Sequence, residues 1–479
     1  MVSKSKKAVG LFSYLKGANW GPKKKTLRTL YLALVRSVIS YGQEVYDSTS
    51  KSILESLDKI QNSVMRKILK CPRSTSVKAM EIVCRIPPLA LFRKLAINRY
   101  WTKVRTEYDH PLKTQYDKHN NPLGRTTEPF QPMGIKDKMF LRDKNLGDIQ
   151  LITRPQINEP WALETPYLDL DLTKVINKKT TNEVAQKTLA MEHIDANYKG
   201  YSKIYTDGSK TKDGVASGSY WEKYDLTVAT KLDANGDLAI TTAELHAIKT
   251  CVDMIHDSNP PRGQKIAILT DSKSAVEALN QPEDNTVRSD LIYTIKKKYT
   301  ALKTNNSMEI AIVWIPSHCE ITGNDIADQA AKMGVDQLNI RNEIGLSLSE
   351  FHNKVKRIAF KDWEEDWLNS GRQTSKYLPS TKHDLLNDDT VGNDKITRLI
   401  LNRPQFIYLP YVEGCAECDR SNTISHVLVH CKTYNLEREL LEKQIGKHIT
   451  DVSDILNIEI VKKHKSDIKS FLSKIKLPI

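Results

Sequence analysis

The 479-residue sequence has little cysteine and no long apolar run. Its seven cysteines are odd in number and scattered, which argues against a disulfide framework and against secretion. The basic N-terminus lacks the clean apolar core of a signal peptide. No uncharged apolar stretch reaches the roughly 18 residues of a membrane-spanning helix, so no membrane interaction is expected. We therefore expect an intracellular protein of the nucleus or cytoplasm.

Acidic residues are scarce in the first quarter of the chain. Residues 1–110 hold 22 Lys and Arg against 7 Asp and Glu, whereas the whole chain has a formal net charge of +14. The positive excess is therefore concentrated near the N-terminus. A region this basic usually binds a polyanion, which makes it a candidate nucleic-acid-binding region. The alternative is a set of solvated helix faces.

The hydrophobic pattern divides the chain into four parts. Residues 1–105 show helical periodicity, for example over 50–70, where Ser50 is a candidate N-cap. Residues 106–198 are polar, contain several prolines, and are predicted to be a linker or irregular connection. Residues 340–479 return to a helical pattern that a Cys/His cluster interrupts.

Residues 199–336 form the fourth part, in which short strands precede an alternation of helices and strands. The predicted strands are 203–206, 215–221, 226–231, 266–269 and 309–314, and the predicted helices are 242–256, 272–279, 287–302 and 325–333. The first three strands are rich in β-branched and aromatic residues and read as an antiparallel meander. The order predicts an α/β fold with a mixed five-stranded sheet and flanking helices, between mostly helical terminal regions.

Four carboxylates lie at strand ends or on helices where they could form a common site. Asp207 and Asp271 end two predicted strands, and Glu244 and Asp328 lie on predicted helices. Because adjacent parallel strands end at one edge of a sheet, where sites gather, the four can be neighbours. Clustered carboxylates repel one another unless one is protonated or a cation lies among them. An all-oxygen set suits Mg²⁺, with Mn²⁺ as a substitute.

This acidic pattern points to phosphodiester chemistry. Two divalent ions about 4 Å apart can stabilise the attacking and leaving oxygens of an in-line displacement. His318 follows the last predicted strand, and its imidazole could carry a proton for such a reaction. Plainer explanations exist for each residue alone: Asp271 could cap the next helix, and a loop histidine is usually only surface. The joint pattern favours a catalytic site.

Five segments carry a resemblance to a known family. They are Tyr-Thr-Asp-Gly-Ser at 205–209, Thr-Ala-Glu-Leu at 242–245, Leu-Thr-Asp-Ser at 269–272, Trp-Ile-Pro-Ser-His at 314–318 and Gly-Asn-Asp-Ile-Ala-Asp at 323–328. In this order they resemble type 1 ribonuclease H over about residues 200–335. The resemblance implies that Asp207, Glu244, Asp271 and Asp328 bind two Mg²⁺ ions and that His318 is the histidine of a mobile loop. It also implies cleavage of the RNA strand of an RNA–DNA hybrid, with no small-molecule substrate.

Further residues of this domain are candidate contacts to nucleic acid. In the cellular enzymes, polar residues just before the helix glutamate contact RNA 2′-hydroxyls, and Thr241 and Thr242 stand there in this chain. Ser209, two residues after Asp207, is a further candidate. Lys296, Lys297 and Lys298 form the main basic cluster, whose role is either phosphate contact or a solvated helix face. The family commonly has glycine two positions after the histidine, where this chain has Glu320.

The flanking regions resemble a larger family. Trp20-Gly21-Pro22 and the segments 29–37, 41–42 and 57–62 are similar to the region after the polymerase palm in jockey-type non-LTR retrotransposon proteins. Residues 363–367 and the Cys/His cluster resemble the C-terminal region of that family. The resemblance implies an origin in a reverse transcriptase polyprotein. We expect no polymerase activity, because the paired aspartates at 387–390 lie in a polar stretch without strand neighbours.

A second candidate metal site lies near the C-terminus. Its spacing is Cys415-x2-Cys418-x7-His426-x4-Cys431. Three thiolates and an imidazole suit tetrahedral Zn²⁺, and the Cys-x2-Cys knuckle is a good half-site. His430 competes with His426 as the fourth ligand.

The sequence thus predicts a hybrid-specific endoribonuclease that uses two metal ions. A catalytically inactive nucleic-acid-binding remnant is the alternative. A DNA transposase or integrase of the same superfold is disfavoured. Those enzymes use the order Asp…Asp…Glu, whereas here Glu244 is second and Asp328 is last. Protein partners are not predicted.

Overall fold

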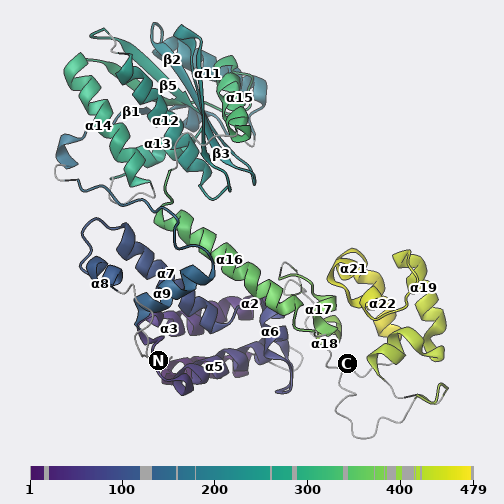
Figure 1. The fold of residues 1–479 in the computed structure, drawn as a ribbon. Helices are drawn as coiled ribbons and strands as arrows, with labels where there is room; N and C mark the ends of the chain where they lie inside the picture. Colours follow the sequence, from purple (N-terminus) through teal and green to yellow (C-terminus); the bar gives the residue numbers. More distant parts are fainter. Residues whose placement is uncertain are drawn as a thin grey trace. The chain divides into compact units, whose positions relative to one another are not determined.

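The chain folds into two compact units (Figure 1). The computed structural model describes residues 2–15, 21–118, 132–157, 160–177, 180–258, 261–282, 288–337, 344–371, 373–381, 383, 385, 395–401, 415, 417–420 and 423–475. Trp20, the predicted helix start at Val287, and the segment 387–390 lie outside these residues. The first unit comprises residues 1–97, 122–140 and 356–479, and the second comprises 98–121 and 141–355. None of the helices in the described ranges is long and apolar enough to cross a bilayer.

The first unit is helical, as the periodicity predicted. Its helices are α1 (Val2–Leu15), α2 (Lys24–Leu30), α3 (Ser37–Ser40), α4 (Gln43–Tyr46), α5 (Lys51–Leu69), α6 (Val77–Cys84), α17 (Gln373–Tyr377), α18 (Lys395–Ile400), α19 (Asn435–Ile445), α20 (Ser453–Leu456), α21 (Ile458–Lys463) and α22 (Lys465–Lys474). Two π-helical turns, Tyr31–Arg36 and His426–His430, interrupt the regular helices. Ser50 precedes α5 as predicted, but its side chain makes no capping hydrogen bond.

Two long helices pass from one unit into the other. They are α7 (Leu89–Thr106) and α16 (Leu348–Leu368), and the unit boundaries fall within both of them and within the shorter helix α9 (Met133–Asp143). The first residues of α16 therefore belong to the second unit. This placement matters for the site described below.

The second unit is built on a six-stranded mixed sheet in the order β1-β6-β5-β2-β3-β4. The strands are β1 (Tyr167–Asp169), β2 (Ser202–Lys210), β3 (Val215–Trp221), β4 (Leu226–Asp233), β5 (Lys265–Thr270) and β6 (Glu309–Trp314). The meander of β2, β3 and β4 is antiparallel, whereas β5, β6 and β1 run parallel to β2. The α/β class is confirmed, but the expected strand number was one too few.

The sixth strand comes from the segment that was expected to be a linker. That expectation is wrong for much of 106–198, which also contains α8 (Lys113–Lys118), α9 (Met133–Asp143), α10 (Leu172–Val175) and α11 (Glu183–Asn197). Asp169 ends β1 and accepts a hydrogen bond from the Tyr198 hydroxyl at 2.5 Å. Its carboxylate also lies 2.7 Å from Nε2 of His193 on α11. These contacts join α11 to the edge of the sheet.

Helices cover both faces of the sheet. They are α12 (Ile240–Asp257), α13 (Lys273–Leu279), α14 (Ser289–Asn306) and α15 (Thr322–Asp336). Ser217 of β3 faces α12, because its hydroxyl lies 2.9 Å from the imidazole of His246. The next residue, Gly218, faces α15. Since successive residues of a strand point to opposite faces, α12 and α15 lie on opposite sides of the sheet.

The close approach of α15 to β3 yields a prediction. A methyl group at Gly218 would lie 2.2 Å from the carbonyl oxygen of Ala327 and 2.5 Å from the nitrogen of Ala331. Both are backbone atoms, so Gly218→Ala must push α15 away, and we expect a loss of about 1–3 kcal/mol in the free energy of unfolding. Chemical denaturation measures it. Gly147→Ala is the control, because nothing lies within 4 Å of the added carbon. Equal stability of the two variants would contradict the close packing.

Candidate functional site

Three of the predicted carboxylates meet at the carboxyl edge of the parallel strands. Asp207 lies on β2, Asp271 follows β5, and Glu244 lies in the second turn of α12. Thr206 and Thr270 pair in the parallel register of β2 and β5, which places the two following aspartates side by side. One oxygen from each of the three carboxylates lies within 4.8 Å of the others. The structure thus brings three of the four predicted carboxylates together.

All five predicted catalytic residues line a single cavity of about 450 Å³. Asp328 enters it from α15, and His318 enters from the loop between β6 and α15. The Asp328 carboxylate also accepts a hydrogen bond from Lys332 at 2.5 Å. His318 is exposed and its φ is 57°, a left-handed conformation that is uncommon for a residue with a side chain. The cavity is large enough to admit a phosphate with hydrated ions around it.

Electrostatic repulsion within the cluster is strong. Burial, the charge of Asp271, and the hydrogen bond and charge of Asp328 together raise the pKa of Asp207 to about 8. The Asp207 residue is only 7% exposed, so water screens these charges poorly. A divalent cation would remove the repulsion, and the donors present are the carboxylate oxygens that Mg²⁺ and Mn²⁺ prefer. The residues therefore fit a divalent metal site.

The plainer explanation of Asp271 as a helix cap does not hold. The cap of α13 is Ser272, whose hydroxyl oxygen accepts the N–H of Ala275 at 3.4 Å. Glu320, the residue at the usual glycine position, has a φ of 54° and lies 3.6 Å from Lys187. It is not among the residues that line the cavity.

Two of the predicted nucleic-acid contacts are wrong. Thr242 is fully buried, and its hydroxyl donates to Glu350 at 2.6 Å. Lys296 is 3% exposed, and its ammonium donates to the carbonyl of Gln281 at 3.1 Å. Neither side chain can reach a nucleic acid, because a partner within the protein holds each of them.

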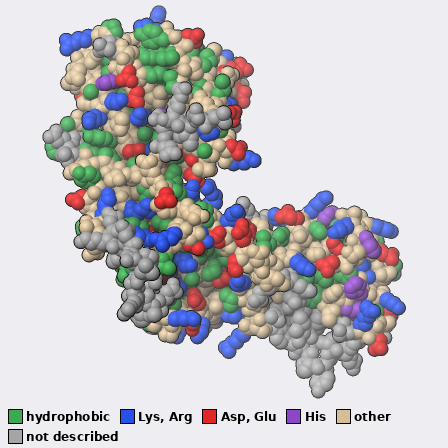
Figure 2. Space-filling view, in the orientation of Figure 1, with side chains coloured by type: hydrophobic (Ala, Val, Ile, Leu, Met, Phe, Trp, Pro, Cys, Tyr) green, Lys and Arg blue, Asp and Glu red, His purple; other side chains and the backbone are tan. Residues whose placement is uncertain are grey.

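The other predicted contacts differ in how accessible they are. Ser209 and Thr241 are half-buried, and Lys297 is exposed. The ammonium group of Lys298 donates a hydrogen bond to the carboxylate of Asp253 at 2.6 Å. On the face shown in Figure 2, basic and acidic side chains are interspersed over the α/β unit. This agrees with its composition, since residues 200–335 hold 15 Lys and Arg against 18 Asp and Glu.

Sequence reasoning missed several residues of the cavity. They are Lys273, Ser274, Ser317, Asn324 and Asp325. Asn324 is 4% exposed, and its side-chain oxygen accepts no hydrogen bond from the described residues. Its position four residues before Asp328, one helical turn away on α15, was the available signal.

The family comparison agrees with this geometry. Residues 199–336 match the family model for RNase H. This part of the chain is a ribonuclease H domain. The chain therefore carries an enzyme domain, which occupies less than a third of its length.

Solved structures were found that are similar to part of the chain. RNase H1 of the halophilic archaeon Halobacterium salinarum is 17% identical with a TM-score of 0.22, over 29% of this chain and 98% of its own. The prototype foamy virus protease-reverse transcriptase is 19% identical with a TM-score of 0.23, over 29% of this chain and 21% of its own. LC11-RNase H1 in complex with an RNA/DNA hybrid is 15% identical with a TM-score of 0.19, over 28% of this chain and 98% of its own. No curated protein was found that matches the chain.

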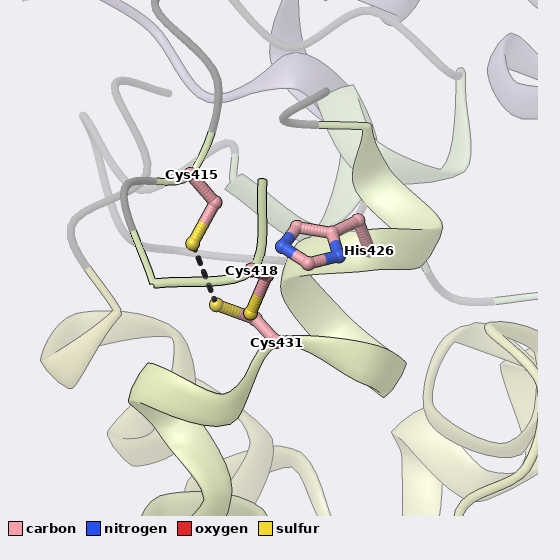
Figure 3. Close-up of side chains that lie close together, drawn as sticks. All are labelled: Cys415, Cys418, His426 and Cys431. Carbon is pink, nitrogen blue, oxygen red and sulfur yellow. Dashed lines mark hydrogen bonds between the residues drawn. The ribbon is translucent and has the colours of Figure 1, made fainter. Parts of the chain in front are cut away.

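A second cluster of ligating side chains lies outside the ribonuclease H domain. Cys415, Cys418, His426 and Cys431 offer ligand atoms within 4.8 Å of one another, and Figure 3 shows the sulfur atoms and the imidazole ring gathered together. The cysteines are free thiols, and Sγ of Cys415 lies 3.6 Å from Sγ of Cys431. Two thiolates on a tetrahedral zinc ion, with Zn–S bonds of about 2.3 Å, would lie roughly 3.8 Å apart. The cluster therefore fits Zn²⁺.

The structure separates the two candidate histidines. Both ring nitrogens of His426 are buried without a hydrogen-bond partner among the described residues, which is costly unless a metal engages one of them. His430 is exposed and does not belong to the group. The geometry therefore favours His426 as the fourth ligand.

This difference gives a paired test of the zinc site. His426→Asn should lose most of the bound zinc during competition with a chelator and should lower the thermal midpoint, because a ligand is missing. His430→Asn is the matched control and should retain the zinc of the parent. Zinc per chain, measured by elemental analysis, and thermal unfolding check both outcomes. Loss of zinc in the His430 variant alone, or a parent that binds none, would contradict the assignment.

Proposed function

We propose that the chain is an endonuclease that hydrolyses the RNA strand of RNA–DNA hybrids. Two divalent ions, Mg²⁺ or Mn²⁺, would be held by Asp207, Glu244, Asp271 and Asp328. The observation that carries this proposal is the convergence of these four carboxylates and His318 on one cavity within a ribonuclease H domain. The ions would supply charge stabilisation for the attacking and leaving oxygens of the phosphodiester.

The side chains of the cavity have distinct tasks in this proposal. The four carboxylates orient the ions, which would offset the repulsion that raises the pKa of Asp207. The exposed imidazole of His318 moves a proton to or from the reacting oxygens at the mouth of the cavity. Lys273 and Asn324 line the same cavity and are suited to hold the phosphate and the attacking water.

The regions outside the domain are proposed to hold nucleic acid. The ribonuclease H domain has more acidic than basic residues, so its own attraction for a polyanion is weak. Residues 1–110 supply the excess positive charge, and the Cys/His cluster supplies a compact zinc module. The flanking resemblances described above support an origin in a jockey-like non-LTR retrotransposon protein.

A second candidate is a nucleic-acid-binding remnant with little or no catalysis. The burial of Thr242 and Lys296 favours it, since two contacts to the hybrid are lost. Cleavage of a labelled hybrid by the purified protein with Mg²⁺, beside single-stranded RNA and duplex DNA, separates the two candidates. Metal-dependent cleavage confined to the hybrid would support the nuclease.

Asp207→Asn tests the metal site within this assay. We expect cleavage to fall by several orders of magnitude, on the order of 10³-fold or more, because a ligand shared by the reacting centre is lost. The fold should survive, and the metal-free variant should be at least as stable as the parent, because asparagine removes the cost of protonating or ionising a carboxyl group beside Asp271 and Asp328. Asp213→Asn, in the exposed turn between β2 and β3, is the matched control. A variant of Asp207 that cleaves like the parent would overturn the site.

His318 has a smaller expected effect. His318→Ala should slow single-turnover cleavage by about 10²-fold or less, because water can replace a proton carrier. His318→Asn separates loss of the imidazole from loop strain, since asparagine tolerates the left-handed backbone at this position. The single-turnover rates of both variants, compared with the rate of the parent, check this expectation. Complete loss of cleavage in a folded variant would instead indicate a ligand role.

A further inference from the structure

The helix that carries Glu244 is capped from outside the ribonuclease H domain. The N-cap position of α12 is Ala239, which has no side chain that can bond the helix, and its first turn holds no acidic residue. A helix usually satisfies its first N–H groups with a side chain at the N-cap or at the third helical position. Here Oε1 of Glu350 accepts the N–H of Ala239 at 2.8 Å and the hydroxyl of Thr242 at 2.6 Å.

Glu350 is firmly held where it caps α12. Its side chain is 3% exposed, and Oε2 accepts the backbone N–H of Ser347 at 2.9 Å and its hydroxyl at 2.7 Å. The buried guanidinium of Arg288 lies 3.5 Å from the same oxygen. Burial alone would raise the pKa of Glu350, but Arg288 and the donors around the carboxylate outweigh it and lower the pKa. An ionised carboxylate at a helix N-terminus is favoured by the helix dipole.

The segment that presents Glu350 is fixed independently of α12. Leu346 donates its N–H to Gln150 at 2.9 Å and accepts the N–H of Ile152 at 3.0 Å. Lys354, one turn after Glu350, forms an ion pair with Asp237 just before α12. Glu350 is therefore a fixed point against which the first turn of α12 is set.

The first turn of α12 leads directly into the metal site. Thr242 precedes Glu244 by two residues, and Glu244 offers one of the three oxygens that lie within 4.8 Å of one another. Metal sites need their ligands placed to within about 0.5 Å. A shift of the first turn would carry Glu244 with it, and the N-cap residue Ala239 provides no side-chain cap of its own to oppose such a shift.

We propose that Glu350 is a positioning residue for the metal site, acting through α12 on Glu244. The nuclease unit then extends to about residue 355 and does not end at residue 336. This inference rests on the proposed function in taking the ions to be catalytic Mg²⁺ or Mn²⁺. It goes further in assigning part of the affinity for those ions to a residue beyond the matched family segment.

The test uses Glu350→Gln in the full chain. The Mg²⁺ concentration for half-maximal cleavage at saturating hybrid should rise about 10-fold or more, as for other residues that orient metal ligands. The maximal rate with saturating Mn²⁺ should return close to that of the parent. A second readout needs no hybrid: the rise in thermal midpoint on adding Mg²⁺ or Mn²⁺ should require a correspondingly higher ion concentration.

Controls separate positioning from a general loss of stability. Asp253→Asn removes a carboxylate from the same helix that pairs with Lys249 at 2.7 Å and Lys298 at 2.6 Å, far from the cap. It should lower stability and leave the ion requirement unchanged. Thr242→Val should also raise the Mg²⁺ concentration for half-maximal cleavage, but by less than Glu350→Gln does. Thr242→Ser keeps the hydroxyl and should match the parent. The double variant should add little to Glu350→Gln, because both changes remove one shared contact.

The outcomes decide between distinct failures. A parent that does not cleave the hybrid would refute the proposed function, while the thermal readout would still test the role of Glu350. An unchanged Mg²⁺ requirement in a folded Glu350→Gln variant would overturn this inference. An equal rise in the Mg²⁺ requirement of Asp253→Asn would overturn it as well. If Glu350→Gln does not fold, the comparison of Thr242→Val with Thr242→Ser decides, and equal requirements in those two would overturn it.

Discussion

Repulsion between carboxylates at one edge of a sheet is the constraint on which the second unit depends. The fold brings to one cavity Asp207 of strand β2, Asp271 just after strand β5, and Glu244 and Asp328 of two helices. The buried strands beneath them supply the free energy that offsets this repulsion, since Ile204, Ile266–Leu269 and Ile310–Val313 are all in the apolar core. The repulsion is relieved when Asp207 is protonated, as its raised pKa indicates, or when a cation lies among the carboxylates, and so the stability of the site is tied to pH and to any cation it binds.

The parts of the fold that could be predicted from the sequence are those with a strong local pattern. The strand predicted at 309–314 coincides with β6, and the strand predicted at 266–269 is the centre of β5. The run 266–269 is fully apolar, and the run 309–314 is apolar after Glu309, which is typical of buried parallel strands. Asp271 directly follows β5, and Asp207, Glu244 and Asp328 lie in motifs of neighbouring elements, so the candidate site could be predicted together with the strands.

The parts that could not be predicted depend on partners far away in the chain. Strand β1 has only three residues and begins with the exposed Tyr167, so it carries no hydrophobic pattern of its own. Its place is set by pairing with β6 and by the hydrogen bonds that Asp169 accepts. Thr242 and Lys296 have polar side chains like those of any surface residue, and only the contacts to Glu350 and Gln281 make them internal. The spacing of residues along the sequence does not indicate such contacts, because their partners are distant in the chain.

The same long-range contacts bear on where the ribonuclease H domain ends. The matched segment, residues 199–336, contains every motif of the site but stops before Glu350. A domain cut at that point would leave the N–H of Ala239 and the hydroxyl of Thr242 without their acceptor, and Arg288 would keep Asp290 but lose its second carboxylate. The two lost hydrogen bonds are worth about 0.5–1.5 kcal/mol each, because water can reach the groups that the cut exposes, and Arg288 loses one of its two ion-pair partners. Since these groups surround the first turn of α12, their loss would destabilise the helix that positions Glu244. The structural boundary of the nuclease is therefore set by hydrogen-bond satisfaction at a helix end, and the sequence motifs alone do not reveal it.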